Sequence, residues 1–519
     1  MKRALCLALC LSLLTLGACG VQTQKAAFTP PEGSVQIVLS DASVTVDGAA
    51  AGTDETAAVW VAHDIVYYPE GKDFTFGEGT AADAHSAEEA DKHTVVHIGK
   101  AGTYVISGSL SAGQIAIDLG DGAEDDPSAV VNLILNGVDI TCTVAPGIIF
   151  YEVYECGSVD AETATAEADT AKAGANLILA DGSENTVRAS YVARIYKEGT
   201  VELSEDGTEV LDAKKQHKYD AAVYSKMSMN VSGGGSLFID AENEGLDTEL
   251  HLTILGGKIR IESGNDGINT NEDGVSVTRI SGGTVQILVT CETGEGDGID
   301  SNGWLIIDGG TVSAQACAKS GDAGIDSDMG IRIGAGSTVI ATGSMLDRIE
   351  EAGQNYCVFT FAAPQPGGKS YSLTDKDGNK IAAFSPDNAF SILVVSSPAL
   401  KAGEYSLSCD GVKLSVAVGS QGGFGGMGGF NSSMIPGGQT PPEGWAEGER
   451  PQGPEGEMPQ RPEGETPPEM PEGELPEGWQ PGDGARPDRG QGGMGGFGNL
   501  EGSEVFSIAD GANYFTVLN

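Results

Sequence analysis

A repeat in the middle of the chain constrains the fold more than any other feature of the sequence. Each copy has a small or acidic residue, then Gly, an aliphatic residue and three polar residues. The four clear copies begin at Glu244, Asp266, Asp297 and Ala323, and a degenerate fifth copy covers residues 221–226. Apolar strands and glycine-rich turns follow each clear copy. The copies lie roughly twenty to thirty residues apart, which is typical of one coil of a parallel β-helix.

The repeat predicts that successive coils stack on one another. A coil of three short strands leaves one backbone edge uncovered, and the next coil satisfies that edge while burying a column of aliphatic side chains. One repeat position supplies such a column, at Leu246, Ile268, Ile299 and Ile325. The 76 glycines and the aromatic content of only 6% also favour a turn-rich β protein over a helical bundle.

Two cysteines, Cys291 and Cys317, share one repeat position, seven residues before the glycine of the third and fourth copies. We favour a buried stack of free thiols at this position, and a disulfide between neighbouring coils is the alternative. The remaining cysteines show no CxxC spacing, which argues against a zinc site.

The N-terminus has the pattern of an export signal. Lys2 and Arg3 precede an apolar run, residues 4–16, that is short for a membrane span. The run ends in Leu-Gly-Ala-Cys, which resembles the bacterial lipobox. We therefore expect residues 1–18 to be a signal peptide and Cys19 to be lipidated. The protein would then be extracellular, anchored to the bacterial cell membrane by this lipid alone.

The remaining chain divides by composition. We expect a tether at residues 19–38, the repeat-containing body at 39–350, and a small β cap at 355–419, where short strands have sandwich-like spacing. Residues 420–500 are rich in Gly, Pro and Glu and have too few apolar residues to bury a core. Residues 501–519 are expected to form one returning strand.

The polar positions of the repeat form two predicted rows. Strand side chains alternate in direction, so the residues beside the aliphatic column should point outward, and stacked strands lie about 4.8 Å apart. The first row is Asp247, Asn269, Asp300 and Asp326. The second row is Glu249, Asn271, Asn302 and Asp328. Asp266 and Asp297 occupy the preceding turn.

These rows predict calcium binding. Like charges opposite one another in a sheet are unfavourable, and a bridging cation removes that conflict. Calcium takes six to eight oxygen ligands in flexible geometry, and nitrogen or sulfur ligands are absent from the rows. The predicted ligands are Asp247, Asp266, Asn269, Asn271, Asp297, Asp300, Asn302, Asp326 and Asp328. The alternative is a solvated acidic face without metal.

Several phrases in chain order, residues 101–108, 135–140 and 179–186, followed by the repeat, resemble a bacterial carbohydrate-binding β-helix family known for binding cellulose and polygalacturonate. The resemblance implies a pectate-lyase-like β-helix, calcium sites on its coils and carbohydrate binding without established catalysis. Two departures affect the ends of the rows. Ala222 replaces the glycine of the degenerate copy, which also has no acid, and Ala323 stands where the two preceding copies have Asp.

We therefore predict an all-β protein, a right-handed parallel β-helix with a small C-terminal β cap and a Pro/Gly/Glu-rich tail. Its predicted function is calcium-dependent, non-catalytic binding of a pectin-like polyuronate or of cellulose, as a monomer. Candidate sugar contacts are Trp304, Lys226 and Arg279. Residues 214–218 contain a basic cluster (Lys214, Lys215, His217 and Lys218) that is a further candidate for meeting a sugar acid. The net charge of -46 argues against nucleic acid and anionic membrane surfaces as partners.

Two other functional classes stay open. A calcium-dependent polysaccharide lyase would need a basic residue to take the proton beside a uronate carboxylate. Candidates for that residue are Lys226, Arg260, Arg279 and Arg332. A structural or adhesion protein would show calcium-dependent stability without affinity for glycans.

Overall fold

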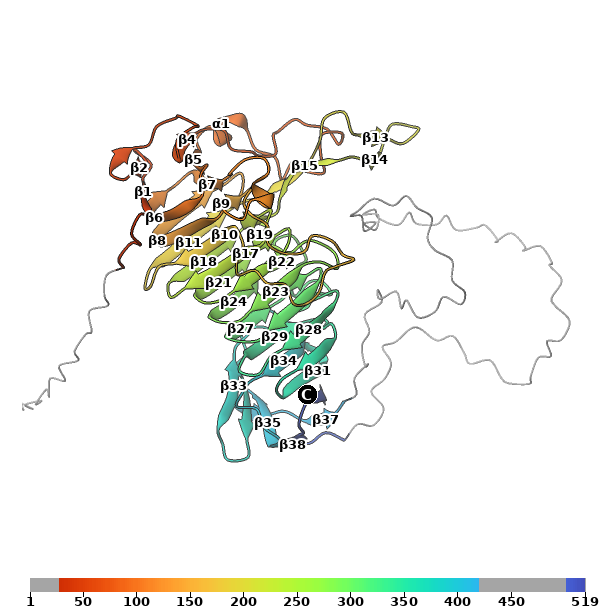
Figure 1. Ribbon diagram of the computed structural model, residues 1–519. Helices are drawn as coiled ribbons and strands as arrows, with labels where there is room; N and C mark the ends of the chain where they lie inside the picture. The colour runs from red at the N-terminus through yellow and green to blue at the C-terminus, as the bar shows by residue number, and fades with distance from the viewer. Residues whose placement is uncertain (1–27, 420–500, 519) are drawn as a thin grey trace, which may run out of the picture.

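The computed structural model describes residues 28–419 and 501–518 of the chain (Figure 1). The described residues are nearly all β, with one four-residue helix, α1 (Ala87–Ala90), near the N-terminal end. Among them, no helix has the length and apolar character that crossing a membrane requires. The prediction of an all-β chain is confirmed. The expected signal peptide, the lipidated Cys19 and the tail at 420–500 lie outside the described residues.

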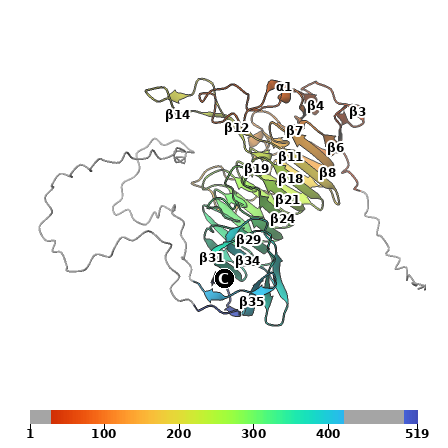
Figure 2. The same cartoon turned by 180° about the vertical axis from the view of Figure 1, so that it is seen from behind.

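Parallel strand pairing organises the body into three ladders (Figure 1). The first ladder joins β1 (Val35–Leu39), β6 (Gly102–Leu110), β8 (Val131–Cys142), β10 (Ala175–Leu179), β17 (Met229–Gly233), β20 (Leu252–Ile254), β23 (Val277–Ile280), β26 (Trp304–Ile307), β28 (Gly330–Ile333) and β30 (Ile349–Ala352). The second ladder continues from the ends of β6 and β8 through β11 (Glu184–Ala189), β18 (Ser236–Ala241), β21 (Lys258–Ser263), β24 (Thr284–Val289), β27 (Thr311–Gln315) and β29 (Thr338–Gly343). Figure 2 shows the strands of this second ladder from behind.

The third ladder carries the repeat. It joins β4 (Val59–Ala62), β5 (Thr94–Ile98), β7 (Gly113–Ile117), β9 (Ile148–Phe150), β16 (Ala221–Ser225), β19 (Glu244–Thr248), β22 (Ile268–Thr270) and β25 (Ile299–Ser301). All of these pairings are parallel except that of β4 with β5. Leu246, Ile268 and Ile299 occupy paired positions and are fully buried, so the predicted aliphatic column is present.

The repeat glycines allow neighbouring coils to approach closely. A Cβ atom on Gly267 would collide with the side chain of Ile287 and with the backbone oxygen of Gly298 on the next coil. Gly245 is confined in the same way by Ile261 and Gly267. The glycine of the repeat is therefore required by the spacing of the coils rather than by an unusual backbone angle.

A C-terminal layer covers the end of the ladders. β34 (Phe390–Ser396) pairs antiparallel with both β29 and β31 (Tyr356–Gln365). β39 (Ala512–Val517) lies between β31 and β37 (Val416–Val418). A smaller sheet contains β32 (Tyr371–Asp375), β33 (Lys380–Phe384), β35 (Gly403–Cys409), β36 (Val412–Lys413) and β38 (Phe506–Ile508). These strands enclose an aromatic-rich core of their own, and the C-terminal residues supply two strands rather than the expected one.

The expected N-terminal boundary is wrong by several residues. We expected a tether as far as residue 38, but β1 begins at Val35 and pairs with β6. Ile37 and Leu39 are buried there, while Val38 between them is exposed. This alternation is that of a strand with one buried face, and it covers an edge of β6 that would otherwise be unpaired.

Cys291 and Cys317 form a disulfide, so the unbonded stack of thiols that we favoured is wrong. The two residues are separated by 26 positions in the chain but lie on neighbouring coils, with their Cα atoms 5.1 Å apart. That separation is within the usual range for a disulfide. The repeat correctly placed the two thiols together, and the distance between coils determines that they bond.

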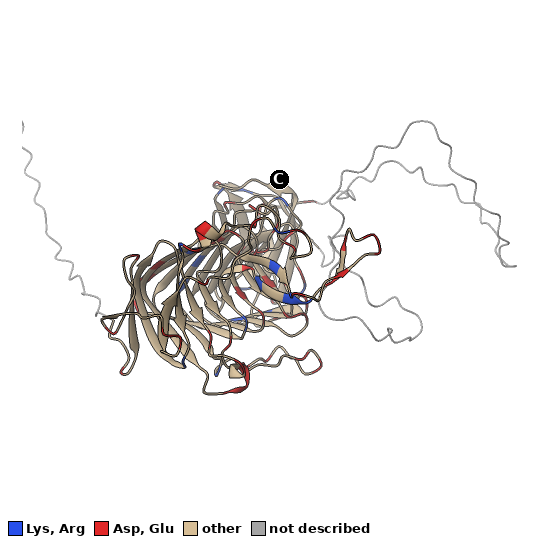
Figure 3. Ribbon diagram, turned by 90° about the horizontal axis from the view of Figure 1, so that it is seen from above, with Lys and Arg blue, Asp and Glu red and all other residues tan. Residues whose placement is uncertain are grey.

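Two segments between the ladder strands cover parts of the body. The first is the antiparallel hairpin of β12 (Val192–Tyr196) and β15 (Lys215–Tyr219), from which β13 (Glu202–Leu203) and β14 (Val210–Asp212) project (Figures 1 and 2). The second is an insertion, residues 157–173, which we call the strap. Ala166 of the strap packs against Val277 and Ile306 of the first ladder. Acidic residues occur in loops as well as in strands (Figure 3).

Candidate functional site

The first predicted polar row exists, and its register is as expected. Tyr224, Asp247, Asn269 and Asp300 occupy paired positions on β16, β19, β22 and β25. The backbone N–H of Asp326 donates to the carbonyl of Ile299 at 2.7 Å, which continues the row beyond the last strand of the ladder. Parallel pairing therefore brings together polar side chains that lie 22 or more residues apart in the chain.

Three acidic residues form a group that we call the upper cluster: Asp220, Glu244 and Asp247. Each offers a carboxylate oxygen within 4.8 Å of the others, and all three residues are buried. Glu244 Oε2 is buried without a hydrogen-bond partner, as is Oδ1 of the adjacent Asn269. Buried polar atoms normally have a hydrogen-bond partner, so these two oxygens are unusual.

The upper cluster is buried, whereas the sequence predicted a row of side chains that points outward. Asp247 is fully buried, and its neighbour in the row, Tyr224, packs its ring against Tyr219 of the hairpin strand β15. Burial raises the pKa of both Glu244 and Asp247 well above the usual range, and nearby carboxylates raise it further. Lys218 of β15 places its Nζ 2.7 Å from Oδ2 of Asp220. That carboxylate raises the pKa of Lys218, so its ammonium remains charged.

A second group, the lower cluster, contains Asp297, Asp300 and Asp326, again with carboxylate oxygens within 4.8 Å of one another. Burial and the Asp266 carboxylate raise the pKa of Asp297 to about 9. Burial and the neighbouring Asp347 raise the pKa of Asp326 to about 9. Oδ1 of Asp326 is buried without a hydrogen-bond partner. The lower cluster thus repeats, two coils farther along, the chemistry of the upper cluster.

Asp266 and Asp297, the two acids in the turns that precede the repeat strands, connect successive coils. Oδ1 of Asp266 accepts the backbone N–H of Asp297 at 2.6 Å, and Oδ1 of Asp297 accepts the backbone N–H of Ala323 at 2.5 Å. Each acid therefore uses one oxygen to hold the next coil and has a second oxygen for other ligands. Ala323 has no carboxylate with which to continue the series, as its departure from the repeat implied.

The second predicted row is not gathered into either cluster. Asn271 donates its side-chain amide to Asp247, and Asn302 donates its own amide to the backbone carbonyl of Asn271 at 3.1 Å. Asp328 is exposed. Glu249 turns to Lys215 and to the hydroxyl of Tyr224 instead. Asn271 thus supports Asp247 of the first row, and Asn302 holds the backbone of Asn271.

Sequence reasoning missed two members of the upper cluster. Glu244 occupies the same repeat position as Asp266 and Asp297, so the repeat itself contained the signal for it. Asp220 precedes the degenerate copy, where the pattern shows no acid, and only its position next to Glu244 identifies it. Both clusters offer oxygen ligands alone, which fits a divalent cation that prefers oxygen.

Trp304 and Arg279 lie on the first ladder, beneath the strap and away from Lys226. Trp304 packs in the small apolar cluster that contains Ala166 of the strap. Arg279 donates to Asp308 at 2.8 Å and to the backbone oxygen of Ala166 at 3.2 Å. Both side chains hold the strap in place, which the sequence could not show because the contacting residues are more than a hundred positions away.

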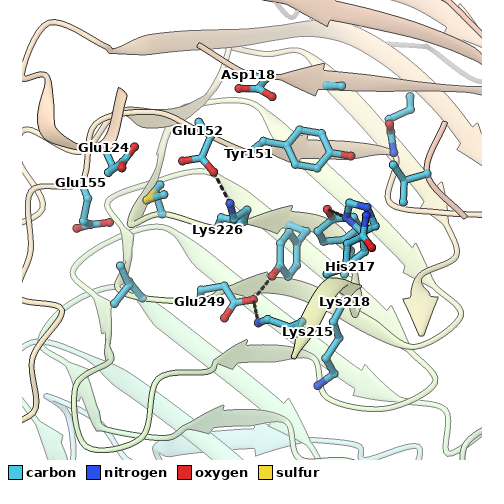
Figure 4. Close-up of a pocket in the computed structure, with 18 of the residues that line it drawn as sticks. Asp118, Glu124, Tyr151, Glu152, Glu155, Lys215, His217, Lys218, Lys226 and Glu249 are labelled. Carbon is cyan, nitrogen blue, oxygen red and sulfur yellow. Dashed lines mark hydrogen bonds and ion pairs between the residues drawn. The ribbon is translucent and has the colours of Figure 1, made fainter. Parts of the chain in front are cut away.

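A cavity of about 850 Å³ lies on the outer side of the third ladder, and Lys226 lines it (Figure 4). Asp118, Tyr151 and Glu152 come from the segments after β7 and β9, while Lys215 and His217 come from β15. Lys226 forms an ion pair with Glu152, and Lys215 forms one with Glu249 at 2.8 Å. The rings of Tyr151 and Tyr219 meet edge to face, with centroids 5.5 Å apart. The cavity thus combines aromatic faces with alternating acids and bases.

Each of the four basic residues considered for lyase chemistry is paired with an acid. The pairs are Lys226 with Glu152, Arg260 with Glu262, Arg279 with Asp308 and Arg332 with Glu167. Each of these side chains therefore already has a carboxylate partner within the fold.

Comparison with known proteins gives the family. The family model described as "Carbohydrate-binding domain-containing protein" matches residues 92–380, more than half of the chain. The chain belongs to this family. The resemblance inferred from the sequence is thereby confirmed at the level of the family.

One relative from Acetivibrio thermocellus has the same description and is 30% identical over 169 residues, which cover 32% of this chain and 45% of the relative. The match therefore spans less than half of that relative's length. A solved structure, described as that of the polysaccharide lyase-like protein from C. thermocellum (gadolinium derivative), is 21% identical with a TM-score of 0.34. The match covers 59% of this chain and 92% of the solved one.

Proposed function

We propose that the protein binds polysaccharide in a calcium-dependent manner, on the scaffold of a right-handed parallel β-helix. The three parallel ladders, the column of buried aliphatic residues and the glycines between coils support this scaffold. Membership of a carbohydrate-binding family supports the ligand class.

One observation carries the calcium part of the proposal: buried carboxylate and amide oxygens without partners lie beside clustered acids. At the upper cluster these are Glu244 Oε2 and Asn269 Oδ1, and at the lower cluster Asp326 Oδ1. Unpaired buried oxygens are costly, and a divalent cation would satisfy them. Asp220, Glu244, Asp247 and Asn269 would hold one ion, and Asp297, Asp300 and Asp326 a second, with Asp266 nearby.

Bound calcium would neutralise these acids and offer open coordination positions to a sugar carboxylate or hydroxyl group. The protein's own contribution to the glycan would come from the cavity. Tyr151 presents part of an aromatic ring to stack on a sugar face. Lys226 and Glu152 supply a donor and an acceptor for hydroxyl groups. We assign pectin-like polyuronate or cellulose as the ligand class.

The cellular setting is part of the same proposal. The short apolar run at residues 4–16 and the lipobox pattern at Cys19 support an extracellular lipoprotein attached to the bacterial membrane. We also propose that it acts as a monomer and without catalysis. A glycan-binding site on a membrane-anchored body would hold the cell against a polysaccharide surface.

Affinity electrophoresis tests the proposed function. The full chain should be retarded in gels that contain polygalacturonate, or be retained by cellulose, when calcium is present, and retention should disappear in chelator. Ultraviolet absorbance of the polyuronate should stay constant, because a rise from new conjugated double bonds would identify a lyase. Calcium-dependent stability with no retention by either glycan would favour the structural or adhesion role instead.

A further inference from the structure

The upper cluster contains a cation that the protein supplies itself. Nζ of Lys218 lies 2.7 Å from Oδ2 of Asp220, in a group whose other members, Glu244 and Asp247, are also buried carboxylates. In the lower cluster, Asp297 and Asp326 are surrounded by further carboxylates, among them Asp322 and Asp347. Among the described residues, Lys218 forms its ion pair with an acid of the upper cluster, and neither Asp297 nor Asp326 of the lower cluster forms one.

We infer that Lys218 is a built-in counterion of the upper cluster, so that a divalent cation enters there only by displacing its ammonium group. The inference rests on the calcium sites of the proposed function and adds their order of filling. The lower cluster is the tighter site and fills first. The upper cluster fills at a higher calcium concentration, because the entering ion competes with Lys218.

The fit of Lys218 to the cluster is incomplete, and this leaves the position open to exchange. Its ammonium bonds to Asp220, yet Glu244 Oε2 remains buried without a partner. One ammonium has three N–H donors, whereas calcium takes six to eight oxygen ligands. A divalent ion would therefore reach the carboxyl oxygen that Lys218 leaves without a partner.

Displacement of Lys218 would change the cavity, because this residue lines it as well. The Lys218 side chain is 41% exposed, so it has room to swing away from Asp220. β15 itself is held by the ion pair of Lys215 with Glu249 and by the contacts of Tyr219 with Tyr151 and Tyr224. The released ammonium would therefore add a positive charge to the cavity and meet the carboxylate of an acidic sugar. Filling of the upper cluster thus favours binding of a uronate.

Calorimetric titration of calcium into the full chain tests this order. The wild type should show one tight and one weaker class of site, and Asp326→Asn should remove the tight class. Lys218→Met should strengthen the weaker class by roughly tenfold or more. Lys258→Met is the control, since this lysine lies at an exposed position of the second ladder, outside both clusters and the cavity, and its isotherm should equal that of the wild type.

Two further measurements keep the inference falsifiable if Lys218→Met folds poorly without calcium. Calcium should raise the thermal midpoint of Lys218→Met by more than it raises that of the wild type. Lys218→Arg keeps the positive charge and should titrate like the wild type. A Lys218→Met isotherm that superimposes on the wild-type isotherm would overturn the inference, whereas no binding of calcium by any of these proteins would overturn the proposed function itself.

Discussion

The side-chain amide of Asn271 donates to both carboxylate oxygens of Asp247, at 2.8 and 3.0 Å. The two residues lie on successive coils, and Asp247 is fully buried. A neutral amide above a buried acid avoids the repulsion that a second carboxylate would cause. The amide that the second row places against Asp247 therefore limits the negative charge that the protein must stabilise before an ion arrives.

Replacing this amide tests that interpretation. Asn271→Asp should lower the free energy of unfolding by about 1–3 kcal/mol in chelator, because it removes a buried hydrogen bond and adds a like charge. Saturating calcium should recover most of the loss. Urea denaturation with and without calcium measures both values. Asn379→Asp, in an exposed turn of the cap, is the control for the same exchange at the surface, and an equal loss in both conditions would argue against an ion beside Asp247.

The raised pKa values predict how stability depends on pH. Asp297 and Asp326 have pKa values raised to about 9, and burial also raises the pKa of Glu244, Asp247 and Asp266. The folded protein holds these protons more tightly than the unfolded chain, whose carboxyl groups titrate near pH 4. Their stabilising effect is therefore complete below about pH 4 and is lost as the pH rises toward 9.

In chelator, the thermal midpoint should accordingly fall between about pH 5 and pH 9. Calcium should flatten this dependence, because it stabilises the ionised carboxylates. Scanning calorimetry across this pH range measures the effect. A midpoint that rises with pH in chelator would contradict the assignment of buried, protonated acids to the two clusters.

The disulfide should contribute to the stability of the coils. Replacing both Cys291 and Cys317 by Ser should lower the free energy of unfolding by about 2–4 kcal/mol, since a cross-link between residues 26 positions apart restricts the unfolded chain. Treatment of the wild type with a reductant should produce a similar loss and should leave the double variant unchanged. If the wild type and the variant unfold at the same urea concentration, the bond has no such role.

The cavity should determine affinity for the glycan without affecting calcium. Lys226→Met combined with Glu152→Gln removes the ion pair and leaves no uncompensated charge. Polygalacturonate affinity should fall by about tenfold, which corresponds to about 1.4 kcal/mol. Lys258→Met, at an exposed position of the second ladder, should bind like the wild type. Equal weakening in both variants would indicate a general charge effect instead of a specific site.

The sequence predicted the features that depend on local periodicity. Alternation and the repeat placed Leu246, Ile268 and Ile299 in one column and Asp247, Asn269 and Asp300 in one row, because parallel stacking preserves register from coil to coil. The same periodicity placed Cys291 and Cys317 together. It did not predict their disulfide, because that bond depends on the distance between two particular coils.

Features that depend on distant segments could not be predicted in this way. Asp247 lies beside Tyr224, whose ring packs against Tyr219 of a hairpin inserted before the repeat, and the repeat pattern alone predicted neither this contact nor the burial of Asp247. Trp304 likewise packs against the strap rather than facing solvent. Asp220 was missed because it stands outside the repeat and joins the cluster only through the fold.

Calorimetric titration of polygalacturonate into the full chain tests the central claim most directly. With calcium we predict saturable binding, and in chelator a loss of affinity of at least about tenfold. The double variant Asp297→Asn, Asp326→Asn should show a similar loss even with calcium present. Binding of equal strength in calcium and in chelator would contradict a calcium-dependent glycan site on the third ladder.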